Sequence, residues 1–121
     1  MKYDDNNIFA KILRGEIPCK KIYEDEFVLS FYDINPQKKV HALVIPKGKY
    51  TDLDDFSSKA SSEEMVGLLK GINTVAKKLG ISSDTGKGYR ALANISEDGG
   101  QEVPHLHFHI FAGEKIGKMV S

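Results

Sequence analysis

Three of the four histidines of this chain stand two residues apart near its C-terminus. The segment 105–110 reads His-Leu-His-Phe-His-Ile, so imidazole and apolar side chains alternate. Successive side chains of a β-strand point to opposite faces of the sheet, and alternate residues share one face at a spacing of roughly 6.6–6.8 Å. The alternation predicts a strand over 103–111 that buries its apolar side chains and presents His105, His107 and His109 to a common site.

The composition limits the class of protein. At 121 residues the chain fits one compact domain over 1–121. The 17 Lys and Arg residues balance 17 Asp and Glu residues without a dense basic stripe, so nucleic acid is not an expected partner. Cys19 is the only cysteine, which excludes an intramolecular disulfide and indicates a reducing compartment. No segment resembles a signal peptide or a membrane span, so we expect a cytoplasmic protein with no membrane partner.

Five β-rich runs are separated by polar or glycine-containing turns. The runs are residues 20–23, 27–32, 40–45, 89–95 and 103–111. The first three follow one another through short turns, which indicates an antiparallel meander.

Two segments repeat apolar residues at helical spacing. The first covers residues 8–13, behind the candidate caps Asp5 and Asn6. The second begins with a candidate capping box formed by Ser61 and Glu64 and continues as a long apolar stripe. Runs of strands with few βαβ units predict an α+β fold. We expect one five-stranded, mainly antiparallel sheet with one long and one short helix.

The histidines themselves suggest a ligand. A single histidine on an apolar face is usually a core residue. Three in alternation would leave several ring nitrogens to satisfy, at roughly 1–3 kcal/mol for each buried nitrogen left unpaired. Two chemistries suit such a face. Neutral imidazoles can chelate a cation such as Zn²⁺. Alternatively, imidazoles can hold phosphate oxygens while a neutral one attacks phosphorus.

The turn before the histidine strand favours the anion. Residues 99–101 read Gly-Gly-Gln, and consecutive glycines allow backbone N–H groups to point at a phosphate, although such a pair is also common in plain turns. Like charges side by side disfavour protonation of all three rings, which leaves one ring neutral near pH 7. The sequence therefore predicts a phosphate site with a neutral histidine available as a nucleophile.

These residues resemble a known family. Segment 105–111 matches the His-φ-His-φ-His-φ-φ signature of the histidine triad superfamily, where φ is an apolar residue, and 99–101 matches the family's Gly-rich turn. Further segments are similar to the Hint branch, the histidine triad nucleotide-binding proteins. They are residues 8–12, 15–18, 23–25, 31–37 and 41–47.

The resemblance implies a function. Hint-like proteins are homodimers whose two sheets join into one, and they bind a purine nucleoside monophosphate, such as AMP or GMP. They hydrolyse nucleoside phosphoramidates through a nucleotidylated histidine and need no metal or organic cofactor. The resemblance therefore implies the same activity and the same assembly for this chain.

The resemblance also implies roles for single residues. His107 corresponds to the nucleophile, with a carbonyl acceptor fixing its tautomer, while His105 and His109 hold phosphoryl oxygens and pass protons. His41 completes the network from a neighbouring strand, although taken alone it is typical of a core histidine. The residues implied for nucleotide binding are Asp33 at the ribose, Asn94, Gly100, Gln101 and Glu102 at the phosphate or leaving group, and Ile8, Phe9, Phe31 and Ile34 around the base.

Some positions differ from the family pattern or have an alternative structural role. Asp33 precedes Asn-Pro and equally suits turn initiation. Glu102 stands where many Hint relatives have Ser or Thr, and 112–114 replaces their Gly-Gly-Arg. Asn7 and Ala10 occupy positions where some superfamily members have zinc-binding cysteines, so we expect no such zinc.

Three other functions remain open on the same residues. The first is hydrolysis of dinucleoside polyphosphates by a related branch of the superfamily. The second is a non-catalytic nucleotide sensor or scaffold. The third is a metal protein that uses the histidine strand.

Overall fold

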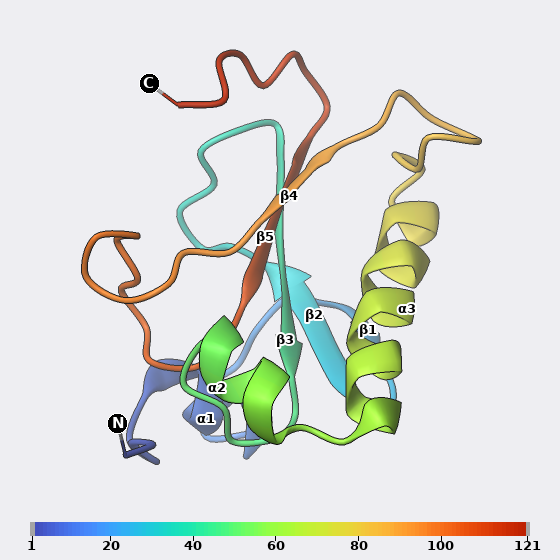
Figure 1. Cartoon of the computed structure of the whole chain (residues 1–121). Helices are drawn as coiled ribbons and strands as arrows, with labels where there is room; N and C mark the ends of the chain where they lie inside the picture. The colour runs from blue at the N-terminus through green and yellow to red at the C-terminus, as the bar shows by residue number, and fades with distance from the viewer. Residues whose placement is uncertain (1, 121) are drawn as a thin grey trace.

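One antiparallel sheet organises the chain (Figure 1). The computed structural model describes residues 2–120. Its strands lie in the order β1-β2-β3-β5-β4, and every neighbouring pair is antiparallel. The elements in chain order are α1 (Ile8–Leu13), β1 (Lys21–Glu24), β2 (Val28–Tyr32), β3 (Val40–Pro46), α2 (Leu53–Lys59), α3 (Ser62–Lys78), β4 (Arg90–Leu92) and β5 (Phe108–Ala112). The expected five-stranded α+β fold is confirmed.

The sheet buries apolar side chains on both faces. On one face Val28, Val44 and Ile110 pack with residues of α3. The alternate positions of the same strands, among them Leu29, Phe31, Leu43 and Ile45, pack with Phe9 of α1. This alternation follows from the two-residue period of a strand. The sheet therefore has an α3 face and an α1 face.

The long helix approaches the sheet closely. Its N-terminus carries the expected capping box, with Ser61 and Glu64 satisfying each other's backbone N–H groups. A Cβ atom at Gly71 would lie 2.7 Å from Cγ2 of Val28, and one at Gly67 would lie 2.5 Å from the ring of Phe27. Glycine at these two positions allows α3 to pack directly onto β2.

Residues 2–120 contain three helices, one more than the expected long helix and short helix. The additional helix, α2, begins after Asp52, whose side chain accepts from the backbone N–H of Asp55. Its sequence Leu-Asp-Asp-Phe-Ser-Ser-Lys has no apolar stripe, and Phe56 is its one buried residue. The cap and the acidic first turn were therefore the signals available in the sequence. The cap of α1 is Asn7 and not Asp5 or Asn6, because its side chain accepts from the N–H of Ala10.

The histidine strand is shorter than expected. Strand β5 begins at Phe108, so His105 and His107 precede the ladder. The backbone N–H of Leu106 instead donates to the carbonyl of Tyr50 at 2.9 Å, and that of His105 donates to the carbonyl of Val103 at 2.9 Å. Loop contacts of this kind, and not strand pairing, hold the first two histidines.

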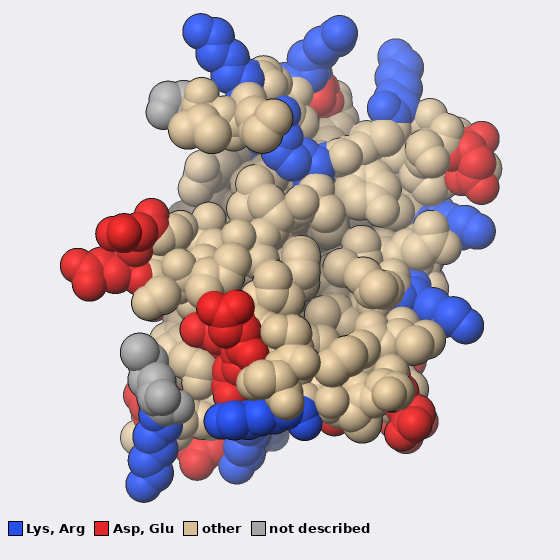
Figure 2. Space-filling view, in the orientation of Figure 1, with Lys and Arg blue, Asp and Glu red and all other residues tan. Residues whose placement is uncertain are grey.

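Strand β4 is also shorter than the expected 89–95 and covers only Arg90–Leu92. Within residues 2–120, no helix has the length and apolar character needed to cross a membrane. Acidic and basic side chains both occur on the face in Figure 2, and neither forms a continuous surface there.

Candidate active site

The four histidines lie along β3, from His41 near its start to His105 beside its last residue, Pro46. His109 lies opposite Leu43 in the ladder between these strands, and His41 lies opposite Phe111. Ring centroids of His107 and His109 are 5.1 Å apart, and those of His41 and His109 are 5.2 Å apart. His107, His109 and His41 therefore form a continuous row of imidazoles, even though His107 lies outside the strand.

Hydrogen bonds define the tautomer of His109. The backbone N–H of Gln37 donates to Nδ1 of His41 at 3.2 Å, so this nitrogen is an acceptor and the neutral ring carries its proton on Nε2. That proton is donated to Nδ1 of His109, since the two nitrogens are 2.9 Å apart. His109 therefore has its own proton on Nε2, which makes this atom a donor.

A second set of contacts gives His107 the opposite tautomer. Its Nδ1 lies 2.7 Å from the backbone carbonyl of His105, which can only accept, so Nδ1 carries the proton. The Nε2 atom then has a free lone pair and makes no hydrogen bond to another residue of 2–120. The only fully enclosed side-chain nitrogen or oxygen without a partner in this range is Oγ1 of Thr51, so Nε2 of His107 reaches solvent. A donor on His109 and a nucleophilic nitrogen on His107 thus stand side by side.

His105 has a different environment. Its ring is completely buried, with Nε2 donating to the carbonyl of Pro46 at 2.8 Å and Nδ1 lying 2.6 Å from the hydroxyl of Tyr3. Both ring nitrogens are used inside the protein, so the expectation that His105 holds a phosphoryl oxygen does not fit this geometry. Its carbonyl, and not its ring, faces His107.

Burial favours the neutral form of all four histidines. Burial, together with a smaller effect of the neighbouring His107, lowers the pKa of His105 and of His109 to about 4. Burial also lowers the pKa of His107 and of His41. A neutral ring at His107 is the form that has a lone pair to offer.

Asp33 supplies the negative charge of the cluster. Its Oδ2 lies 3.5 Å from Nε2 of His41, and its charge raises the pKa of His41, His107 and His109 against the effect of burial. Its Oδ1 accepts from the backbone N–H of Asn35 at 2.8 Å, so Asp33 also initiates the turn. Asp33 can therefore initiate the turn and also take part in the site.

One metal-compatible cluster lies within residues 2–120. Ligand atoms of Asp33, His41 and His109 all fall within 4.8 Å of one another. Because His41 and His109 already share a hydrogen bond at 2.9 Å, a metal ion would have to replace that bond.

The four apolar residues expected around a base divide into two pairs. Phe9 and Phe31 are buried and meet edge to face at 5.7 Å, and Phe9 also contacts the ring of His107 at 4.9 Å. Ile8 is 46% exposed and Ile34 is 90% exposed. The two phenylalanines thus form the apolar floor beneath the histidines, while the isoleucines offer uncovered apolar surface.

The remaining expected residues lie around the 96–101 turn. Gly100 has φ of +74°, a conformation that favours glycine. The amide nitrogen of Gln101 donates to the carbonyl of Thr51 at 2.7 Å and its oxygen accepts from the N–H of Ser96 at 3.0 Å, so this side chain fastens the turn. Asn94 is half-buried just after β4. Glu102 is exposed, and its charge raises the pKa of His107.

No pattern in the sequence indicated three of the histidines' hydrogen-bond partners. They are the hydroxyl of Tyr3, the backbone N–H of Gln37 and the carbonyl of Pro46. Tyr3 is 102 residues from His105, and backbone groups are present at every position. Only the tertiary fold brings these partners to the rings.

Comparison with known proteins agrees with this geometry. The family model for the HIT domain matches residues 14–116. An uncharacterized 13.2 kDa HIT-like protein of Azospirillum brasilense is 55% identical over 98% of this chain and 95% of its own. A purine nucleoside phosphoramidase of Escherichia coli is 37% identical over 97% of this chain and 95% of its own. The structure of a HIT family hydrolase from Clostridium thermocellum superposes with a TM-score of 0.86 at 36% identity, covering 98% of this chain and 99% of that one. The chain therefore belongs to the histidine triad (HIT) family.

Proposed function

We propose that this protein hydrolyses purine nucleoside phosphoramidates to a nucleoside monophosphate and an amine. The observation that carries the proposal is the pair of opposite tautomers, with a free lone pair on His107 beside an N–H donor on His109. Phosphoryl transfer requires a nucleophile and a stabiliser of charge on the phosphoryl oxygens, and the two rings suit these roles.

In the first step, Nε2 of His107 attacks the α-phosphorus and forms an N–P bond. The bond from phosphorus to the leaving amine breaks, and the amine takes up a proton from solvent. As His107 gives up its lone pair its ring becomes cationic, and the carbonyl of His105 stabilises the Nδ1 proton at 2.7 Å. His109 donates its Nε2 proton to a phosphoryl oxygen as negative charge develops there.

In the second step, water attacks phosphorus and gives a proton back to solvent, and the bond to Nε2 of His107 breaks. A nucleoside monophosphate leaves, and His107 recovers its lone pair. One water is consumed in the whole cycle, and no redox partner or metal takes part. Asp33, at the edge of the cluster, is assigned to the ribose hydroxyls, because a carboxylate offers acceptors only.

Two further features support the proposal. The 37% identical relative from Escherichia coli is named a purine nucleoside phosphoramidase and aligns over 97% of this chain. The buried Phe9 and Phe31 and the exposed Ile8 and Ile34 provide apolar surface next to the histidines for a purine base. We further propose that the protein acts as a homodimer, as the resemblance implies.

The proposal is tested by comparing substrates under one set of conditions. Purified protein would be assayed with adenosine 5′-phosphoramidate and with diadenosine polyphosphates, each with and without a chelator. We expect faster release of AMP from the phosphoramidate, unchanged by the chelator, and loss of turnover in His107→Gln. Asn73→Ala, an exposed substitution on α3, is the control and should be as active as the wild type.

Other outcomes would replace the proposal. Faster cleavage of the polyphosphates would assign the anhydride as substrate. Nucleotide binding without turnover of either substrate would indicate a sensor or scaffold, and loss of turnover in the chelator would indicate a metal enzyme.

A further inference from the structure

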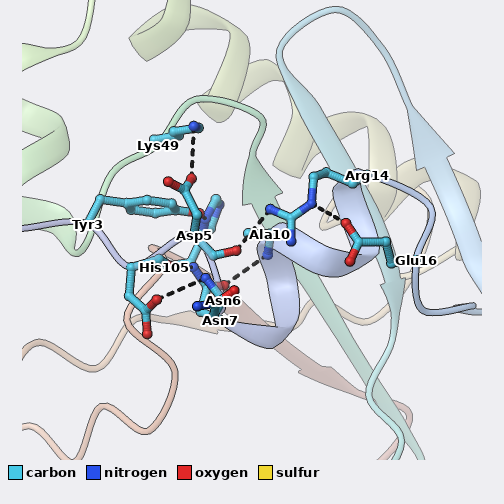
Figure 3. Close-up of polar contacts among 10 residues, drawn as sticks. Tyr3, Asp5, Asn6, Asn7, Ala10, Arg14, Glu16, Lys49 and His105 are labelled. Atoms are coloured by element: carbon cyan, nitrogen blue, oxygen red, sulfur yellow. Dashed lines mark hydrogen bonds and ion pairs between the residues drawn. The ribbon is translucent and has the colours of Figure 1, made fainter.

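The segment before α1 forms an ordered arm against the active site. Lys49 makes an ion pair with Asp5 at 2.8 Å, and Arg14 donates to the carbonyl of Asp5 at 2.9 Å. The side-chain amide of Asn7 donates to the carbonyl of Asp4 at 2.7 Å. Figure 3 shows these contacts around the arm, with Tyr3 at its outer end. The arm is therefore fastened at Asp4 and Asp5, directly after the residue that reaches the histidines.

Tyr3 provides the second hydrogen bond of the His105 ring. Nε2 of His105 donates to the carbonyl of Pro46, so its Nδ1 is an acceptor, and the Tyr3 hydroxyl donates to it at 2.6 Å. The two rings also meet edge to face at 5.6 Å. Burial raises the pKa of Tyr3, which keeps its hydroxyl protonated as a donor. Without this hydroxyl, a completely buried ring nitrogen would lose its partner.

The position of His105 matters because of its backbone carbonyl. That carbonyl accepts the Nδ1 proton of His107 at 2.7 Å and so fixes the tautomer that leaves Nε2 free. Residues 105–107 lie outside the β5 ladder, so strand pairing does not hold this carbonyl in place. The side chain of His105, pinned between Tyr3 and Pro46, is one of the anchors that do.

We propose that Tyr3 is a positioning residue: its hydrogen bond to His105 holds the carbonyl that orients His107 for attack on phosphorus. The inference rests on the proposed function for its kinetic consequence. Tyr3 lies outside residues 14–116, the segment that matches the HIT domain model. The arm thus adds to the site a contact that comes from beyond the matched domain.

The test compares three variants. Tyr3→Phe removes the hydroxyl and keeps the ring, Tyr3→Ala removes both, and Tyr23→Phe is the matched control. Tyr23 likewise donates one hydrogen bond, to Asp25 at 2.7 Å, but it lies on β1 and contacts none of the histidines. We expect kcat of Tyr3→Phe to fall about 5- to 10-fold, the effect of losing one hydrogen bond of ordinary strength. KM should change little, Tyr3→Ala should lose more, and Tyr23→Phe should match the wild type.

Nitrogen-15 NMR of the imidazoles gives a readout that does not need turnover. In the wild type, His107 should show a single tautomer protonated on Nδ1. In Tyr3→Phe the Nδ1 signal of His105 should shift and His107 should show a mixture of tautomers, whereas Tyr23→Phe should leave both rings unchanged.

Unaltered His105 and His107 signals in Tyr3→Phe, with kcat equal to that of Tyr23→Phe, would overturn the inference. An inactive wild type would refute the proposed function instead. The NMR comparison would then still decide whether Tyr3 orients His107.

Discussion

Two neighbouring histidines of this protein carry their protons on opposite ring nitrogens, and backbone groups decide which. The carbonyl of His105 holds the proton of His107 on Nδ1, while the N–H of Gln37 acts through His41 to leave the proton of His109 on Nε2. Backbone groups cannot change their donor or acceptor character with pH. The assignment of nucleophile and donor is therefore built into the fold and does not depend on different pKa values of the two rings.

Asp33 is expected to contribute mainly to substrate binding. Asp33→Asn keeps the shape of the side chain and removes the charge that raises the pKa of His41, His107 and His109. Because hydrogen bonds to a charged group are stronger than neutral ones, KM for a nucleotide substrate should rise roughly tenfold or more. Steady-state kinetics of Asp33→Asn and of the exposed control Asp54→Asn measure this, and equal KM values in the two variants would remove Asp33 from the ribose site.

Stability should fall as the pH drops through the histidine range. The pKa of His105 is about 4 in the folded chain, against its ordinary value of 6.5. Between these values the unfolded chain binds a proton that the folded chain does not, so the contribution is complete above pH 6.5 and is lost as the pH falls towards 4. For His105 alone the loss is about 3 kcal/mol.

Urea unfolding at pH 7, 6, 5 and 4.5 measures this loss. Acidic groups with lowered pKa act in a lower range: hydrogen bonds from Lys21 and Lys47 hold the pKa of Glu24 at about 2, so its contribution is lost only below about 4.5. A free energy of unfolding that stays constant from pH 7 to 5 would contradict the burial of a neutral His105.

Among the elements, the continuous β-rich runs and the long helical stripe were the predictable ones. The runs of β2 and β3 were readable because strands buried on both faces are almost continuously apolar, and the stripe of α3 was readable because burial on one helix face imposes a period of 3.6. Helix α2 buries only Phe56 and was missed. The histidine strand was extended too far, because His105 and His107 alternate as in a strand but are held by loop contacts.

The candidate site was likewise predictable only in part. The histidine motif located the row of imidazoles, because residues close in sequence stay close in space. It did not reveal Tyr3, which depends on an arm 102 residues away, and it gave His105 a contact with phosphate that its buried ring cannot make. Family resemblance identifies positions in a site, whereas the partner of each nitrogen follows from the packing of the whole chain.

The close contact between α3 and β2 predicts that a larger residue at Gly71 lowers the stability of the protein. Gly71→Ala would place a Cβ atom 2.7 Å from Cγ2 of the completely buried Val28, so one of the two elements must move. Overpacking of this kind typically costs about 1–3 kcal/mol, more than the helix propensity of alanine returns. Chemical denaturation should show Gly71→Ala to be less stable than wild type. Asn73→Ala, exposed on the same helix, should not be destabilised, and equal stability of the two variants would mean that α3 is not packed tightly on β2.

For the whole molecule, the resemblance to Hint-like proteins predicts assembly into a homodimer. Within residues 2–120, β1 and β4 each pair with a strand on one side only, and joining two sheets through one of these edges would cover backbone groups that are otherwise open. Light scattering or sedimentation should give twice the chain mass of 13.5 kDa. A mass of one chain at micromolar concentration, with full activity, would show that the site is complete without a partner.

The central claim is that His107 becomes covalently bonded to phosphorus during turnover. Its most direct test is to quench the reaction of the protein with an adenosine phosphoramidate and to locate the adenylyl group by peptide mass spectrometry. The group is predicted on His107 in the wild type and nowhere in His107→Gln. An adenylyl group on His41, His105 or His109, or continued turnover by His107→Gln, would contradict the account.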